Sequence, residues 1–279
     1  MFRIPPTDIS IVKPIAAGAY GQVGMAYYHD QVVAVKSLLA AKRTNMDQLV
    51  HFVNEIKLHS QIECDYIVQF IGASWNKPSD IVMVTEYMDK GDLRNFLQAT
   101  TPATLAWRDK LDVALSVGHA LVYLHSLDLK VIHRDLKSRN VLLNSAMHAK
   151  LTDFGVSREF DDIETLTADV GTYRWMAPEV LQDGHYTESA DIYSFGVILA
   201  ELSTHLIPYQ DLKNARGNPY TDTALMAKVM QGEIMPSFAV GSPLWYVQFG
   251  QRCMALKPQR RPTAMEVVHM IMTELRKLH

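Results

Sequence analysis

The sequence contains little cysteine and no excess of positive charge. Cys64 and Cys253 are far apart, and no second cysteine pair at metal-ligand spacing accompanies them, so neither a disulfide framework nor a zinc site is indicated. The 27 basic residues are outnumbered by 30 acidic ones, for a formal charge of −3, whereas phosphate-backbone binding needs a basic surface. We therefore expect a protein of a reducing, intracellular setting that does not bind nucleic acid.

Long apolar runs are also absent. The first ten residues, MFRIPPTDIS, lack the apolar core of a signal peptide, and the longest apolar stretch, around residues 195–200, is far too short to cross a bilayer. We expect no membrane segment in this chain and a cytoplasmic location, while a longer, membrane-tethered parent chain stays open. With 48% hydrophobic and 20% charged residues, the chain has enough apolar surface for a large buried core.

The order of local patterns predicts strands first and helices afterwards. β-branched runs at residues 9–15, 31–38, 67–71 and 81–85 indicate strands. Apolar residues at helical spacing from Met46 predict one helix among them, with Thr44 or Asn45 as its cap. Helical spacing from Trp107 predicts a second long helix, and residues 191–202 are apolar nearly all round, which is typical of a buried helix.

The strongest motif is HRDLKSRN at residues 133–140, followed by Asp-Phe-Gly at 153–155. Upstream lie the glycine-containing segment IAAGAYGQV at 15–23, the strand segment VAVK at 33–36 and Glu55 in the first predicted helix. Phosphoryl transfer needs backbone that cradles phosphates, a lysine, metal-binding oxygens and one carboxylate base, and these motifs supply all four. In this order they resemble the catalytic domain of protein kinases.

The resemblance implies a role for each central residue. Asp135 would accept or orient the proton of the substrate hydroxyl, and Lys137 would steady the transferring phosphoryl group. Asn140 and Asp153 would hold Mg²⁺, for which Mn²⁺ is a possible substitute. Lys36 would contact the ATP that the resemblance implies as cofactor.

The expected nucleotide site draws on both halves of the chain. ATP would lie at the junction of two lobes, where the family position of each residue implies contact or support from Ile15, Ala16, Gly18, Gly21, Val23, Ala34, Lys36, Glu55, Thr85, Glu86, Met88 and Leu142. Taken alone, the glycines are equally typical of a hairpin turn, the lysine of an edge strand and the glutamate of a solvated helix face. Thr85 resembles the small residue at the back of the adenine pocket, although a strand threonine needs no such reason.

The family resemblance covers almost the whole chain and therefore implies a single domain. The fold would be α+β and two-lobed, with a small antiparallel sheet and one helix in an N-lobe of about residues 1–86. A hinge at about 86–92 would lead to a larger, mainly helical C-lobe of about 93–279. Asp191 resembles the aspartate that braces the catalytic loop, while an N-cap role is equally compatible with its position. Glu179 and Arg261 resemble a structural ion pair.

Two details favour serine and threonine as substrates. Lys137 stands two residues after Asp135, and Thr172 in GTYRWMAPE matches the threonine that links these two residues in serine/threonine kinases. The sequences of the segments WMAPE and DIYSFGVIL are most similar to those of the tyrosine-kinase-like group. We expect protein substrates, with dual-specificity or tyrosine kinase activity as an alternative.

Control by an upstream kinase is also expected. Arg134 directly before Asp135 is typical of kinases whose activation loop needs an acidic group, and Thr165 and Thr167 are the candidate phosphorylation sites. Nearby acidic residues could already serve Arg134 instead, namely Glu159, Asp161, Asp162 and Glu164. The sequence does not determine the oligomeric state.

Two departures from the family pattern support a rival interpretation. Ala16 replaces a glycine, and His59 occupies a position where the family packs an aliphatic residue, so a buried imidazole would need a partner there. Both would fit a pseudokinase that acts as a binding or allosteric module. An unrelated nucleotide hydrolase is not favoured, because the G-x-x-x-x-G-K-[ST] loop is missing.

Overall fold

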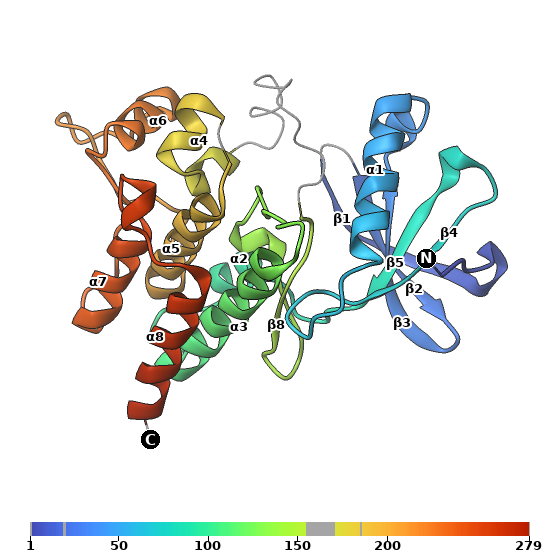
Figure 1. Cartoon of the computed structure of the whole chain (residues 1–279), viewed down its shortest axis with the longest axis horizontal. Helices are drawn as coiled ribbons and strands as arrows, with labels where there is room; N and C mark the ends of the chain where they lie inside the picture. Colours follow the sequence, from blue (N-terminus) through green and yellow to red (C-terminus); the bar gives the residue numbers. More distant parts are fainter. Residues whose placement is uncertain (1, 19–20, 155–170, 185, 279) are drawn as a thin grey trace. The chain divides into compact units, whose positions relative to one another are not determined.

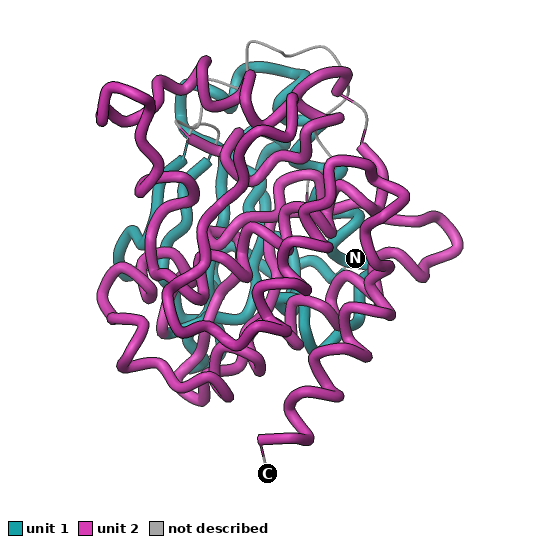
Figure 2. Tube along the Cα trace, turned by 90° about the vertical axis from the view of Figure 1, so that its left-hand side faces the viewer, with its two compact units in different colours: residues 1–89, 155–169 teal, residues 90–154, 170–279 magenta. Residues whose placement is uncertain are grey.

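The computed structural model describes residues 2–18, 21–154, 171–184 and 186–278, which form two compact units (Figure 2). The N-terminal unit contains described residues up to 89, and the C-terminal unit contains those from 90 onwards. Gly155, Thr165, Thr167 and the four acidic residues between 159 and 164 lie outside the described residues. Within the part that is described, no helix is long and apolar enough to span a membrane.

The N-terminal unit contains one antiparallel sheet of five strands in the order β1-β2-β3-β5-β4. The strands are β1 (Ile9–Ala17), β2 (Gly21–Tyr28), β3 (Gln31–Leu38), β4 (Phe70–Ser74) and β5 (Val82–Glu86). Short 3-10 turns lie at Pro6–Asp8, Ala40–Lys42 and Pro78–Asp80. The predicted α+β organisation, with the sheet first, is confirmed.

One helix, α1 (Met46–His59), lies alongside this sheet (Figure 1). Asn45 caps it by accepting a hydrogen bond from the Gln48 N–H, which decides between the two predicted caps. Phe52 and Ile56 are buried with Met83 of β5 in one core cluster. The helix therefore covers the sheet face that carries Met83, and this packing stabilises an element too short to be stable alone.

The opposite face of the sheet forms a second core. Val33 and Val35 of β3 are buried there with Val84 and Ile4. Ala34 and Lys36 alternate with the two valines and pair with Thr85 and Met83 of β5. Period-2 alternation therefore places Lys36 on the face covered by α1, as the sequence predicts.

The C-terminal unit is mainly helical. Its helices are α2 (Leu93–Gln98), α3 (Trp107–Ser126), α4 (Pro178–Asp183), α5 (Glu188–Thr204), α6 (Asp222–Met230), α7 (Leu244–Cys253) and α8 (Ala264–Lys277). A small sheet has the order β6 (Gly91–Asp92), β7 (Val141–Leu143) and β8 (Ala149–Leu151), and 3-10 turns occur at Ser138–Asn140, Thr172–Trp175 and Pro258–Arg260. Helix α3 packs against α8, and both are visible side by side in Figure 1.

Helix α5 is the buried helix that the sequence predicts. Every residue from Ala190 to Ser203 is buried, so the helix forms the centre of its unit. It begins at Glu188, with Thr187 at the N-cap position. The N-cap interpretation of Asp191 is therefore wrong, because this residue lies inside the first turn.

Strand boundaries differ from the expectation in two places. The apolar residues from Ile67 predict a strand at 67–71, but β4 begins at Phe70. Ile67 and Val68 are buried but lie outside the ladder of β4 and β5, and Ile67 takes part only in an isolated bridge. The second strand, β2, is missing from the predicted set, because its glycines and tyrosines break the β-branched pattern.

Candidate active site

Lys36 and Glu55 form an ion pair within the N-terminal unit. The Lys36 Nζ atom lies 2.5 Å from Glu55 Oε1, and the two side chains are 24% and 12% exposed. Lys36 lies on β3 and Glu55 on α1, so the pair exists only because the helix packs on that sheet face. A lysine held in this way presents a fixed positive charge, unlike the mobile edge-strand lysine that was the alternative.

The glycine-containing segment joins β1 to β2. Gly18 N–H donates to the Gly21 carbonyl over 2.8 Å, and a Cβ added at Gly21 would lie 2.9 Å from the Ser37 carbonyl oxygen. Ala16 pairs with Val23 directly after a β-bulge, and its φ is not positive. The backbone at this position needs no glycine, so Ala16 causes no local strain.

The same sheet face carries the other adenine-pocket candidates of this unit. Val23 lies opposite Lys36, and Ala34 lies opposite both Met25 and Thr85. Directly opposed residues share a face, so alternation brings these side chains together. Met25 also lies on this sheet face, and the sequence reasoning missed it. It stands two residues after Val23 in the same strand, and this spacing is the signal that could have identified it.

Three further candidates lie near the ends of strands. Ile15 lies close to the end of β1, Glu86 is the last residue of β5, and Met88 follows β5. Ile15 falls in a β-bulge between the paired residues Pro14 and Ala16 and is 43% exposed. The Glu86 carboxylate accepts the Gln69 N–H over 2.6 Å, which ties β5 to the segment before β4. Met88 is buried. Leu142 lies on β7, in the other unit, where it pairs with Asp92 and Lys150.

The catalytic-loop residues converge in the C-terminal unit. Lys137 Nζ lies 3.1 Å from Asp135 Oδ2 and donates to Thr172 Oγ over 3.1 Å. Asn140 Nδ2 donates to the Asp135 carbonyl over 2.8 Å and to its carboxylate over 3.1 Å. One carboxylate is thus oriented by a lysine and an amide, and its side chain is still 18% exposed. This arrangement suits a carboxylate that accepts a proton from a bound hydroxyl.

Asp153 follows β8 and is linked to the same loop through the backbone. The N–H of its neighbour Thr152 donates to the Asn140 carbonyl over 3.0 Å, and the Thr152 carbonyl lies 3.1 Å from His133 Nε2. Asp153 has a φ of 57°, the left-handed region that most residues avoid. Phe154 is buried against the His133 ring. These contacts fix the position of Asp153 relative to Asn140.

Asn140 and Asp153 provide oxygen ligands of the kind a hard divalent cation takes. Because the Asn140 amide nitrogen is used by Asp135, its amide oxygen is the atom left for a cation. A carboxylate and an amide oxygen suit Mg²⁺ or Mn²⁺ better than softer metals. The two residues therefore fit the metal that the kinase fold implies, in combination with phosphate oxygens.

Asp191 braces the backbone of the catalytic loop. Its carboxylate accepts the His133 N–H over 2.9 Å and the Arg134 N–H over 3.1 Å, and His125 Nε2 lies 2.9 Å away. Arg134 has a φ of 64°, which costs about 1–2 kcal/mol for a residue with a side chain. The buried carboxylate thus holds a strained residue directly before Asp135, as the bracing interpretation predicts.

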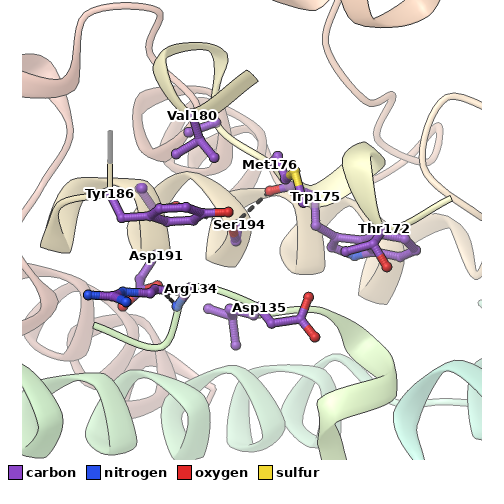
Figure 3. Close-up of a pocket in the computed structure, with 12 residues that line it drawn as sticks. Arg134, Asp135, Thr172, Trp175, Met176, Val180, Tyr186, Asp191 and Ser194 are labelled. Atoms are coloured by element: carbon purple, nitrogen blue, oxygen red, sulfur yellow. Dashed lines mark hydrogen bonds between the residues drawn. The ribbon is translucent and has the colours of Figure 1, made fainter. Parts of the chain in front are cut away.

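A hollow lies beside Asp135 in the same unit (Figure 3). Its lining includes Arg134, Thr172, Trp175 and Tyr186. Figure 3 shows the Asp135 carboxylate directed towards Thr172 and away from Asp191. The segment that contains Thr172 and Trp175 therefore borders the hollow together with the Asp135 carboxylate.

Glu201 is a site-forming residue that sequence reasoning missed. This carboxylate of α5 is 1% exposed and accepts hydrogen bonds from Trp175 Nε1 (2.6 Å), Ser138 Oγ (2.8 Å) and Arg94 (3.0 Å). Burial raises its pKa to about 7, against the effect of these three donors. Glu201 is the one charged residue of α5 after Asp191, and a charge in this apolar run is the signal that could have identified it, since buried charges need partners.

Glu179 and Arg261 form the expected structural pair. Two Arg261 nitrogens donate to the two Glu179 oxygens over 2.5 and 2.7 Å, a bidentate geometry, and a further bond reaches the Ser189 carbonyl. The pair ties α4 to the start of α5 and contains no residue of the candidate site. It serves the fold of this unit.

Comparison of the sequence with known proteins identifies its family. The protein kinase domain family matches residues 9–271. The serine/threonine/tyrosine-protein kinase HT1 of Arabidopsis thaliana is 35% identical over 94% of this chain, which spans 65% of that protein.

Other curated relatives are similarly distant. The serine/threonine-protein kinase STY17 of Arabidopsis thaliana is 32% identical over 99% of this chain and 46% of its own length. A putative mitogen-activated protein kinase kinase kinase 7-like protein of Drosophila melanogaster is 33% identical over 91% of this chain and 63% of its own length. The chain thus spans less than two thirds of each of these three relatives. With its fold and its motifs in family order, it belongs to the protein kinase domain family.

Proposed function

We propose that the chain transfers the γ-phosphate of ATP to serine and threonine hydroxyls of protein substrates. The observation that carries the proposal is the Asp135 carboxylate held by Lys137 and Asn140, beside the segment that contains Thr172. The ion pair of Lys36 with Glu55 supports it from the other unit. The names of the relatives agree with a kinase that acts on serine and threonine.

Each residue of this chain has a defined task in the proposed reaction. Bound ATP supplies the phosphoryl group, and its divalent metal neutralises phosphate charge. Asp135 orients the substrate hydroxyl and accepts its proton, while the Lys137 ammonium stabilises negative charge near that carboxylate. Lys36 binds phosphate oxygens, and Glu55 keeps its ammonium in place. Asn140 and Asp153 hold the metal, which we propose to be Mg²⁺, with Mn²⁺ as a substitute.

The adenine-pocket candidates and the lobe boundaries are part of the same proposal. Residues up to about 86 form the N-lobe, about 86–92 the hinge and about 93 onwards the C-lobe. Adenine would contact the face that carries Val23, Ala34 and Thr85, and Leu142 stays a predicted contact. An upstream kinase and an intracellular, cytoplasmic site of action complete the proposal, since ATP is available there.

Transfer of labelled phosphate from Mg·ATP to a generic basic protein tests this function. Asp135→Asn and Lys36→Met should each abolish labelling, because the first removes the base and the second the phosphate-binding cation. Asp183→Asn and Lys57→Met are matched controls, since both replace exposed residues outside the site. Labelling that persists in Asp135→Asn points to a contaminating kinase. No transfer by folded, ATP-binding wild-type protein would favour the pseudokinase alternative.

Dual specificity is the second candidate, because the relative HT1 carries tyrosine as well as serine and threonine in its name. Acid hydrolysis of the labelled product releases phosphoserine, phosphothreonine and phosphotyrosine, which electrophoresis then separates. We expect phosphoserine and phosphothreonine to dominate. Mainly phosphotyrosine would overturn the assignment of the hydroxyl class.

A further inference from the structure

His59 lies on the buried face of α1, one turn after Glu55. Its side chain is 1% exposed, and its Nε2 atom lies 2.5 Å from the main-chain carbonyl oxygen of Val68. A carbonyl oxygen can only accept a hydrogen bond, so Nε2 must carry the proton. Val68 is itself buried, so the bond is shielded from water.

This hydrogen bond joins α1 to the sheet at a second point. Val68 lies two residues before β4 (Phe70–Ser74), and β4 pairs with β5, which pairs with β3. Lys36 lies on β3 and receives Glu55 from α1. Residues four apart in a helix share a face, so Glu55 and His59 attach the same face of α1 to the same sheet.

An aliphatic side chain at position 59 could fill the space but could not make this bond. Packing alone allows a helix to slide or rotate over an apolar surface, whereas a short hydrogen bond to the backbone fixes both its rotation and its height. The Phe70 ring packs beside the imidazole, with the two ring centroids 5.9 Å apart. This ring contact constrains the orientation of the helix less than the Nε2 hydrogen bond does. His59 therefore makes a directional hydrogen bond at a position where an aliphatic residue would make only apolar contacts.

We infer that His59 is a positioning residue that fastens the last turn of α1 to Val68 and thereby keeps Glu55 on Lys36. The consequence for catalysis rests on the proposed function, in which Lys36 binds phosphate. If α1 moves away from the sheet, both attachments break together. Loss of the hydrogen bond between His59 and Val68 should therefore weaken the ion pair of Lys36 with Glu55, although neither of these two residues is changed.

Amide hydrogen exchange along α1 tests the structural part without reference to activity. His59→Leu keeps apolar volume and removes the donor, while His59→Gln keeps an N–H at a similar distance from the backbone. We expect exchange of α1 amides to rise about tenfold in His59→Leu, the effect of one buried hydrogen bond, and to stay within about threefold of wild type in His59→Gln. His51→Leu is the matched control on the same helix and should leave exchange unchanged.

Phosphate transfer tests the catalytic part. In His59→Leu the KM for ATP should rise and kcat should fall, with rescue in His59→Gln, because the defect lies in the placement of Lys36. Equal losses in the leucine and glutamine variants would show that ring shape matters and not the bond, and would overturn the inference. Wild-type exchange rates in His59→Leu would also overturn it.

A measurement on the wild-type protein covers the case in which His59→Leu does not fold. Nitrogen-15 NMR of histidine side chains should show the proton of His59 on Nε2, protected from exchange. An unprotonated Nε2 would overturn the inference. If the exchange and NMR results agree with it but the wild-type protein transfers no phosphate, the failure belongs to the proposed function and the attachment of α1 stands.

Discussion

The indole Nε1 of Trp175 donates a hydrogen bond of 2.6 Å to the buried carboxylate of Glu201. Ser138, directly after Lys137 in the catalytic loop, donates to the same carboxylate, and so does Arg94 of α2. One side chain of α5 thus joins the catalytic loop to the segment that holds Thr172. The distance between Lys137 and Thr172 depends on this junction as well as on their own hydrogen bond.

Replacing Glu201 with Gln should destabilise the protein by about 2 kcal/mol, because the amide NH2 group cannot accept a hydrogen bond and one of the buried donors, such as Trp175 Nε1, loses its acceptor. Urea titration followed by tryptophan fluorescence measures the change. Glu233→Gln, at an exposed position, should have no measurable effect. Adding Trp175→Phe to Glu201→Gln should cost less than the sum of the two single changes, since the donor that lost its acceptor is then removed. A further additive loss would contradict the proposed pairing energetics.

The same residue predicts a pH dependence of stability. Burial raises the pKa of Glu201 from 4.5 to about 7, so the folded protein binds its proton more tightly than the unfolded chain does. The corresponding stability is fully present below pH 4.5 and is lost as the pH rises to about 7. The advantage of wild type over Glu201→Gln should therefore be larger at pH 5 than at pH 7.5. Urea titrations at both values that gave one constant difference would contradict this.

Replacement of Asp191 by Asn should reduce kcat about tenfold to hundredfold. An amide oxygen can replace only part of the carboxylate, so one of the two N–H groups of His133 and Arg134 loses a charge-assisted bond. The left-handed backbone before Asp135 then relaxes. Steady-state kinetics should show a smaller change in the KM for ATP than in kcat. Asp183→Asn is the control, and an equal loss in both variants would argue against a local effect.

The Thr85→Met variant should weaken inhibitors that reach past adenine by about tenfold or more, with little change in the KM for ATP. Thr85 is 8% exposed and lies opposite Ala34, so both side chains at this point are small. A longer side chain at position 85 would fill the space that these inhibitors need beyond adenine. Competition binding with two inhibitors, one confined to the adenine region, measures the difference. Thr223→Met, at an exposed site on α6, is the control. Equal inhibition of wild type and Thr85→Met would count against this position.

Activation by phosphorylation remains a prediction for Thr165 and Thr167. Alanine at both positions should lower activity at least tenfold if a phosphate is needed to neutralise Arg134 and order the segment. Phosphatase treatment of wild type should produce the same loss. An unchanged rate after complete dephosphorylation would show that the acidic residues nearby suffice.

Local patterns in the sequence account for much of the fold. Period-2 alternation placed Lys36 on one strand face and Val35 on the other, and apolar spacing identified α1, whose cap the sequence left open between Thr44 and Asn45. The strand predicted at 67–71 begins only at Phe70, because burial of Val68 looks the same in the sequence as strand pairing. Periodicity reports which side of a segment is buried, and it does not report what that side contacts.

By itself the sequence determined the family and the arrangement of a sheet followed by helices, and it predicted most of the candidate site, because these depend on short motifs and on local spacing. Only the tertiary structure decided two of the partners, namely Glu201 for Trp175 and Val68 for His59. A buried polar group must find a partner, and the sequence shows that need. Which partner it finds depends on how helices and strands pack, since hydrogen bonds form between groups that folding brings within about 3 Å of each other.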